Sequence, residues 1–146
     1  MKDIKPILLV EDSPQDEKLI LRTLRKVNLA NQVVVARDGQ QALDYLFREG
    51  EFAGRVGTEL PAVVLLDINL PRVNGLDVLA QLRADPRTTL LPVVILTSSD
   101  EERDRLKSYE HRANSFVRKP LEFAEFADTV ARLGVYWLAI NLPPKE

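Results

Sequence analysis

The sequence contains no cysteine, and this absence removes three kinds of chemistry. The chain can form no disulfide bond, no thiolate metal site and no cysteine nucleophile, and nothing in it calls for an oxidising compartment. Glycine is also scarce, with six residues, and neither a GxxxxGKS/T nor a GxGxxG phosphate loop is present. Nucleotide binding therefore has no support in the sequence.

An excess of charge of one sign and long apolar runs are lacking as well. The 20 Lys and Arg residues are balanced by 22 Asp and Glu residues, so the chain has no electrostatic footprint of a nucleic-acid-binding domain. No apolar stretch is long enough to span a bilayer, and the N-terminus lacks the apolar core of a signal peptide. We therefore expect a cytoplasmic protein that binds neither nucleic acid nor membrane.

The sequence does contain a repeated alternation of short apolar runs with stretches of helical period. The apolar runs are residues 7–10, 33–35, 62–66, 93–96 and 116–117. Because they show little polar alternation, we expect strands that are buried on both faces, in a parallel sheet covered by helices on each side. The predicted fold is α/β, a doubly wound five-stranded parallel sheet of order 2-1-3-4-5 and flavodoxin-like, in a single domain over residues 1–146.

Cap residues place the starts of several helices. Ser13-Pro14 is typical of an N-cap followed by proline at the first helical position, and Asn74-Gly75 indicates another helix start. Ser99 and Glu102 predict a capping box. The helix after Ser99 is mostly charged, and its expected apolar edge consists of Leu106, Tyr109 and Ala113.

Polar residues follow four of the five predicted strands, at the point where each strand ends. They are Glu11 and Asp12 after the first strand, Asp67 after the third, Thr97 after the fourth, and Lys119 with Pro120 after the fifth. The carboxyl ends of parallel strands meet at one edge of such a sheet, so we expect these side chains to converge in one shallow crevice. Taken alone, Asp12 or Thr97 is more simply explained as a residue that ends a strand or begins a helix. The complete set is hard to assign to chance.

Three carboxylates that lie close together repel each other, so either some of them bind protons or a cation neutralises them. Oxygen ligands without nearby His or Cys suit a hard ion, and we expect this ion to be Mg²⁺. Asp67 can then act as a nucleophile toward a phosphoryl group. The Thr97 hydroxyl and the Lys119 ammonium can hold the phosphoryl oxygens opposite the metal.

The ordered set of motifs resembles the response regulator receiver domain of two-component signalling. These motifs are Leu9-Val10-Glu11-Asp12, Leu65-Leu66-Asp67-Ile68-Asn69-Leu70-Pro71, Leu96-Thr97-Ser98 and Lys119-Pro120. The resemblance extends over nearly the whole chain, from Ile4 to Leu133. The loop before the third strand, Ser108-Tyr109 and the ending Tyr136-Trp137-Leu138 are similar to the single-domain subgroup that serves bacterial phytochromes and similar sensor kinases.

The resemblance implies a role for each residue of the crevice. Asp67 would be the phosphoacceptor. Mg²⁺ would be bound by Glu11, Asp12 and Asp67 together with the backbone carbonyl of Asn69. The phosphoryl group would contact Thr97 and Lys119.

The resemblance also implies a conformational switch. Phe116 stands three residues before the lysine, where the family has its switch aromatic, and it would rotate into the space that Thr97 vacates. The Lys119-Pro120 bond is expected to be cis. Two positions depart from the family pattern: Arg112-Ala113-Asn114 lacks the glycine that is common there, and Asn74 replaces a usual aspartate.

The function implied is that of a phosphorylation-controlled response regulator, a signalling protein that catalyses only its own phosphotransfer and dephosphorylation. Its partners would be a sensor histidine kinase, with a phytochrome among the candidates, and a downstream target or phosphotransfer protein. One alternative is a binding module that works independently of phosphorylation. Another is an aspartyl-phosphate phosphohydrolase, which is disfavoured because Asn69 stands where such an enzyme has its second aspartate.

Two further features leave alternatives open. The apolar C-terminal segment, residues 135–146, either extends the last helix over the core of the domain or forms a contact in a homodimer. Such a dimer would pair with two-fold symmetry through the face made by the helix after Ser99, the strand at residues 116–117 and the last helix. His111, the only histidine, lies in a charged stretch, which favours a plain surface residue over a phosphotransfer histidine.

Overall fold

The computed structural model describes residues 4–27, 30–55 and 60–144. Its five strands are β1 (Ile7–Val10), β2 (Val33–Ala36), β3 (Val63–Leu66), β4 (Val93–Thr97) and β5 (Ser115–Arg118). The helices are α1 (Pro14–Lys26), α2 (Gly39–Phe47), α3 (Gly75–Ala84), α4 (Glu102–Glu110) and α5 (Phe123–Val135), with a short 3₁₀-helix, η1 (Gly50–Phe52), and a π-helix, η2 (Tyr136–Ile140). All strand pairs are parallel, in the order β2-β1-β3-β4-β5, which confirms the predicted fold class.

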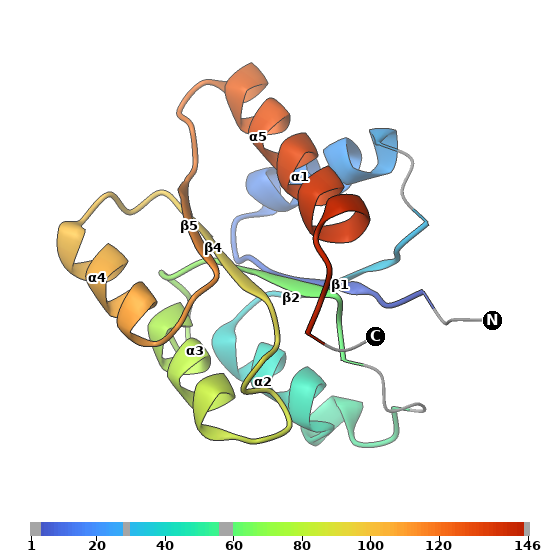
Figure 1. The fold of residues 1–146 in the computed structure, drawn as a ribbon, viewed down its shortest axis with the longest axis vertical. Coiled ribbons are helices and arrows are strands. Elements are labelled where there is room, and N and C mark those ends of the chain that lie inside the picture. The colour runs from blue at the N-terminus through green and yellow to red at the C-terminus, as the bar shows by residue number, and fades with distance from the viewer. Residues whose placement is uncertain (1–3, 28–29, 56–59, 145–146) are drawn as a thin grey trace.

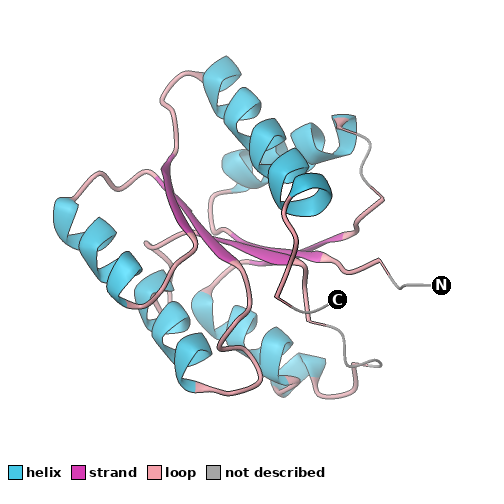
Figure 2. Cartoon of the chain, viewed as in Figure 1, coloured by secondary structure: helices cyan, strands magenta, loops and turns pink. Residues whose placement is uncertain are grey.

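Helices cover both faces of the sheet (Figures 1 and 2). On one face, α1 and α5 pack together over a cluster that includes Ile7 and Leu9. On the other face, α2 and α3 pack over a cluster that includes Leu8 and Val10. Successive side chains of a strand point to opposite faces, and here both faces are apolar. This is why the first run shows no polar alternation: none of its four residues is more than 2% exposed.

The caps of α1 and α3 agree with the prediction. The Ser13 hydroxyl accepts a hydrogen bond from the Asp16 amide at 3.3 Å, with Pro14 at the first helical position. The Asn74 side chain accepts one from the Asp77 amide at 3.0 Å. Both caps lie close to the ends of β1 and β3, and they therefore set where the chain turns away from the expected site.

Gly75 starts α3 in tight contact with the loop that follows β3. A Cβ atom at this position would lie 2.0 Å from the backbone oxygen of Asp67, which is far inside van der Waals contact. The Gly75 amide also donates a hydrogen bond to the carbonyl of Ile68 at 2.7 Å. Only a residue without a side chain allows the two backbone segments to come this close. Gly75 therefore helps to hold the Asp67 backbone in place.

We expect Gly75→Ala to destabilise the protein by roughly 1–3 kcal/mol, because the new methyl group must push the Asp67 backbone aside. Urea denaturation measures this loss. Gly54→Ala is the matched control, because a Cβ atom at Gly54 would meet nothing within 4 Å. Equal stability of the two variants would contradict the tight contact.

The start of α4 differs from the prediction, and the expected capping box is wrong. The helix begins at Glu102 after Glu101, which makes no side-chain cap. The Ser99 hydroxyl instead donates to the Asp104 carboxylate at 2.7 Å and accepts from the Glu101 amide at 3.4 Å. Ser99 therefore precedes the helix without serving as its N-cap.

The apolar edge expected for α4 is also wrong in part. Leu106 and Tyr109 are 60% and 52% exposed, and only Ala113 of the expected set is buried. Ser108 is the one buried residue within α4, and its hydroxyl donates to the Asp104 carbonyl at 2.8 Å. The helix therefore rests on the domain with very little apolar contact.

The turn between α4 and β5 achieves a left-handed conformation without glycine. Arg112 has a φ of 61°, a region that favours glycine. Its carbonyl accepts hydrogen bonds from Nε and Nη2 of Arg83 at 3.2 and 3.0 Å. The Arg83 guanidinium thus stabilises a turn in which the glycine typical of the family is missing.

Candidate functional site

The sheet brings the ends of β1, β3, β4 and β5 to one edge, and its backbone hydrogen bonds continue just past the strands. The Asp67 amide donates to the carbonyl of Val10 at 3.1 Å, and the Lys119 amide donates to the carbonyl of Thr97 at 2.7 Å. These bonds fix the backbone of residues that no longer belong to a strand. Their side chains therefore start from rigid positions at the carboxyl edge.

Glu11, Asp12 and Asp67 converge at this edge, as the sequence predicts. One carboxylate oxygen from each residue lies within 4.8 Å of the other two. Glu11 and Asp67 are 1% and 6% exposed, whereas Asp12 faces solvent. Such an oxygen-only set, open on one side, is typical of a site for a divalent metal ion.

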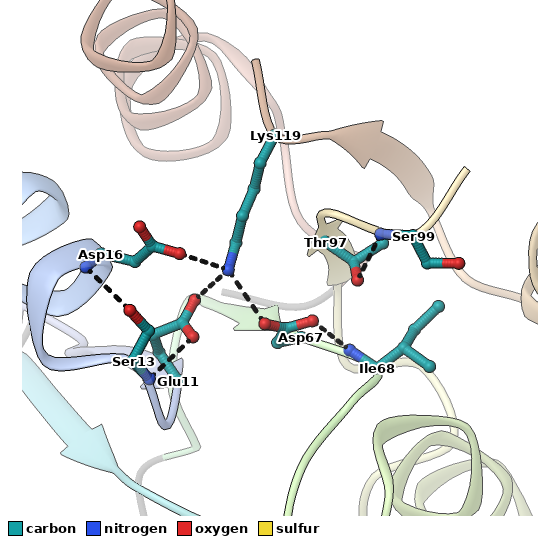
Figure 3. A network of polar contacts seen from close by, with 8 residues as sticks. All are labelled: Glu11, Ser13, Asp16, Asp67, Ile68, Thr97, Ser99 and Lys119. Atoms are coloured by element: carbon teal, nitrogen blue, oxygen red, sulfur yellow. Dashed lines mark hydrogen bonds and ion pairs between the residues drawn. The ribbon is translucent and has the colours of Figure 1, made fainter. Parts of the chain in front are cut away.

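Lys119 reaches across the crevice from the end of β5 and is itself only 6% exposed. Its Nζ atom donates to Glu11 Oε1 at 2.6 Å, to Asp67 Oδ2 at 2.9 Å and to Asp16 Oδ2 at 2.8 Å (Figure 3). All three hydrogens of the ammonium group are used, and every acceptor is a carboxylate. The lysine is therefore held in the centre of the acidic cluster.

Asp16 is the member of this network that the sequence analysis missed. It lies in the first turn of α1, three residues after the Ser13 cap, and its side chain is 30% exposed. An acidic residue in a first helical turn is common for reasons of helix stability alone, so the sequence gives no sign of a partner. The only available signal is proximity: α1 begins next to the end of β1, where Glu11 lies.

Backbone amides fix the orientation of the two buried carboxylates. Asp67 Oδ1 accepts a hydrogen bond from the Ile68 amide at 2.7 Å, and Glu11 Oε2 accepts one from the Ser13 amide at 3.2 Å. The other oxygen of each group is bonded to Lys119. Each carboxylate thus has one oxygen held by the backbone and one shared with the ammonium.

The site contains more negative than positive charge. Four carboxylates, from Glu11, Asp12, Asp16 and Asp67, lie at the crevice, and the Lys119 ammonium pairs with three of them. Burial raises the pKa of Glu11 to about 7, a change that the hydrogen bond from Lys119 only partly offsets. Burial alone would lower the pKa of Lys119, but its bonds to Asp16 and Glu11 and the charge of Asp67 raise it above its ordinary value. Both groups therefore keep their protons to a higher pH than usual. This is expected where negative charges are crowded, and a bound cation would stabilise the cluster further.

The raised pKa of Glu11 predicts how the stability of the metal-free protein depends on pH. The contribution of Glu11 is fully present below the ordinary pKa of 4.5 and is lost as the pH rises through about 7. We expect the free energy of unfolding in EDTA to fall by roughly 1–3 kcal/mol across this window. Urea denaturation at a series of pH values measures it. Glu11→Gln should flatten the slope, and an unchanged slope in that variant would contradict the assignment.

Thr97 and Phe116 lie on β4 and β5, the two neighbouring strands at one side of the crevice. Thr97 ends β4 with no exposed surface, and Figure 3 shows it on the side of Asp67 away from Asp16. Its hydroxyl accepts a hydrogen bond from the Ser99 amide at 3.3 Å. Phe116 is partly buried in β5 and packs against the core cluster beneath α2 and α3. Asn69 is exposed in the loop after Asp67.

The predicted cis bond between Lys119 and Pro120 is wrong. The described residues contain no cis peptide bond. The trans isomer is the intrinsically favoured one, by about 0.5–1 kcal/mol for a bond before proline.

His111 caps the C-terminal end of α4, where its amide donates to the carbonyl of Lys107 at 3.0 Å. The strand that follows, β5, runs from this end toward the crevice, so the histidine lies at the opposite edge of the sheet. Its position gives it no part in the acidic network.

The C-terminal segment divides into an inward and an outward side. Trp137 and Leu138 pack against the core cluster beneath α1 and α5. Ile140 and Leu142 are 60% and 85% exposed, and Val135 and Ile140 line a shallow apolar hollow against α5. The segment thus covers part of the domain's own core and also exposes an apolar surface. Residues 145–146 of the expected segment lie outside the described residues.

Comparison with known proteins connects this site to a family. The sequence matches the response regulator receiver domain over residues 7–131. Across the described part of the chain, no helix has both the length and the apolar character to cross a membrane.

Three solved structures are similar over nearly the full chain. The bacteriophytochrome response regulator RtBRR is 52% identical, with a TM-score of 0.77 over 98% of this chain and 86% of that one. The phosphorylated cyanobacterial phytochrome response regulator RcpA is 35% identical, with a TM-score of 0.91 over 98% and 100% of the chains. The Mn²⁺-bound form of response regulator Rcp1, a protein known from Synechocystis, is 34% identical, with a TM-score of 0.89 over 96% and 99%.

Proposed function

The chain belongs to the response regulator receiver domain family, and we propose that it is a switch in which Asp67 accepts a phosphoryl group from a sensor histidine kinase. As a receiver domain it is a signalling protein rather than an enzyme that turns over a separate substrate. The observation that carries the proposal is the buried Asp67 carboxylate, held between the Ile68 amide and the Lys119 ammonium inside an acidic cluster. We further propose that residues 1–146 act as one receiver domain in the cytoplasm.

We assign the metal of this site as Mg²⁺, with Glu11, Asp12, Asp67 and the backbone carbonyl of Asn69 as its protein ligands. Three observations support this assignment: the ligands are all oxygens, the cluster has an excess of negative charge, and the site is open toward Asp12. The bound ion supplies positive charge that stabilises the phosphoryl group during transfer. The Mn²⁺-bound form of Rcp1 is a related protein with a divalent ion.

In the transfer step, an Asp67 oxygen attacks the phosphorus of the kinase's phosphohistidine. A new oxygen–phosphorus bond forms as the phosphorus–nitrogen bond breaks, and the histidine nitrogen keeps the electron pair. Lys119 already lies 2.9 Å from Asp67 Oδ2, so its ammonium is placed to contact a phosphoryl oxygen with little movement. Thr97 would donate its hydroxyl to another oxygen.

Coupling of the site to the surface would run through Thr97 and Phe116. When the Thr97 hydroxyl turns toward a phosphoryl group, it gives up the hydrogen bond from the Ser99 amide. Phe116, which is only partly buried, then rotates into the space that is vacated. The neighbouring α4 is held by little apolar contact, so it can move at low cost and change the surface that a target protein recognises.

The kinase that serves this switch is proposed to belong to the phytochrome class, because RtBRR and RcpA are described as phytochrome response regulators. The test is transfer from purified phosphorylated kinases, one of the phytochrome class and two of other classes, with Mg²⁺ present. We expect intact mass spectrometry to show one added phosphoryl group fastest with the phytochrome-class kinase. Transfer from none of them, together with binding of a target that ignores phosphorylation, would instead favour a phosphorylation-independent binding module.

We also propose a homodimer, formed through the face of α4, β5 and α5 together with the C-terminal segment. The outward apolar side chains of that segment support it, because exposed apolar patches commonly mark contact surfaces. The test is sedimentation velocity at several concentrations, with and without beryllofluoride. A dimer that weakens on substitution of Leu142→Asp is the expected result. A monomer under all conditions would rule the dimer out and leave the segment as a cover for the domain's own core.

A further inference from the structure

Lys119 has three carboxylate partners, and Asp16 differs from the other two. Glu11 and Asp67 each contribute an oxygen to the cluster that suits a metal ion, whereas Asp16 is not part of it. The Asp16 carboxylate nevertheless lies 2.8 Å from the Lys119 ammonium, as close as the Asp67 carboxylate. Asp16 is therefore a partner of the lysine alone.

The position of Asp16 is fixed by the start of α1. Its amide donates to the Ser13 hydroxyl, and the Ser13 amide donates in turn to Glu11 Oε2. Figure 3 shows Asp16 approaching the ammonium from the side away from Asp67. The carboxylate thus points into the crevice from a rigid helical turn and is only 30% exposed.

The ammonium and a divalent ion need the same two carboxylates. Lys119 is bonded to Glu11 Oε1 and Asp67 Oδ2, at 2.6 and 2.9 Å. An ion that binds Glu11 and Asp67 draws on the same negative charge, and two cations on shared ligands repel each other. As the ion is bound, the ammonium must loosen its hold on both carboxylates without leaving the crevice.

We propose that Asp16 is a positioning residue that holds the Lys119 ammonium while a divalent ion takes up Glu11 and Asp67. This rests on the proposed function, in which Lys119 contacts the phosphoryl group. Of the three carboxylates that pair with the ammonium, Asp16 is the one outside the cluster that would bind the ion. It keeps the lysine at the crevice, aimed at Asp67, and lowers the competition between the two cations.

The first test is binding of Mn²⁺ alone, followed by electron paramagnetic resonance, in wild type, Asp16→Ala, Lys119→Met and the double variant. We expect Asp16→Ala to weaken binding roughly tenfold, the scale of one charge-assisted hydrogen bond. In the Lys119→Met background the same change should cost less than about twofold, since no ammonium remains to compete. Equal losses in both backgrounds would show that Asp16 acts only as a distant charge and would overturn the proposal.

Glu17→Gln is the matched control for charge. Glu17 lies in the same first turn of α1, but its carboxylate pairs with Arg37 at 3.0 Å rather than with the site. Glu17→Gln removes one negative charge from the same helical turn, and we expect an effect on Mn²⁺ binding below about twofold. A tenfold loss in this variant would also overturn the proposal.

The second test is the rate of phosphorylation by acetyl phosphate at saturating Mg²⁺. Asp16→Ala should slow labelling several-fold, and Asp16→Glu should recover part of the rate because it retains the charge. Unchanged labelling of Asp16→Ala would overturn the role of Asp16. Absence of labelling in the wild type would instead overturn the proposed function, and the Mn²⁺ series would still decide whether Asp16 positions Lys119.

Discussion

Asp67→Asn is expected to abolish phosphorylation. The amide oxygen that replaces the carboxylate is a poor nucleophile, and the variant also removes one of the three ligands of the acidic cluster. The measurement is intact mass after incubation with acetyl phosphate and Mg²⁺. We expect no added phosphoryl mass in the variant and one in the wild type.

The same variant should remain folded. Asp67 is one of three carboxylates that pair with the same ammonium, so removing its charge relieves repulsion in the metal-free protein. We therefore expect the urea midpoint in EDTA to stay equal or rise. Asp77→Asn, at an exposed position in the first turn of α3, is the control and should label normally. Strong labelling of Asp67→Asn would show that another residue is the phosphoacceptor.

Lys119→Ala is expected to have the second largest effect, on both stability and switching. Without the ammonium, Glu11 and Asp67 remain buried with no positive partner, and the metal-free protein should lose roughly 3 kcal/mol of unfolding free energy. Part of this loss should be recovered by Mg²⁺, because the ion binds the same carboxylates. Urea denaturation with and without Mg²⁺ measures both quantities.

The effect of Lys119→Ala on phosphorylation and on the conformational switch is measured separately. Some labelling at Asp67 should persist, because the nucleophile and the metal ligands are intact. The ring signals of Phe116 in the nuclear magnetic resonance spectrum should shift on addition of beryllofluoride in the wild type and not in the variant. Lys18→Ala, at an exposed position of α1, is the control. A normal shift of Phe116 in Lys119→Ala would contradict a role for the lysine in coupling.

Most of the fold could be predicted because its main determinants are local. Four-residue apolar strands such as β1 are buried on both faces. An N-cap residue followed by apolar residues at helical spacing, as in α1, specifies where a helix begins. A parallel sheet then brings the strand ends together by geometry alone. The convergence of Glu11, Asp12 and Asp67 follows from that geometry, which is why it could be foreseen without a structure.

The features that were missed depend on side-chain partners that the neighbouring sequence does not specify. Asp16 and Lys119 are 103 residues apart, and an aspartate in a first helical turn looks the same whether or not a lysine meets it. At the start of α4, the Ser99 hydroxyl can bond either to a backbone amide of the helix or to another polar side chain, and here it donates to Asp104.

The central claim is that a divalent ion at the acidic cluster makes Asp67 a phosphoacceptor. The most direct measurement is the intact mass of the wild-type protein after incubation with acetyl phosphate, once with Mg²⁺ and once with EDTA, followed by mapping of the labelled residue. We predict one added phosphoryl group, located on Asp67 and dependent on Mg²⁺. A group that is added equally well in EDTA, or that maps to a residue outside the cluster, would contradict the claim.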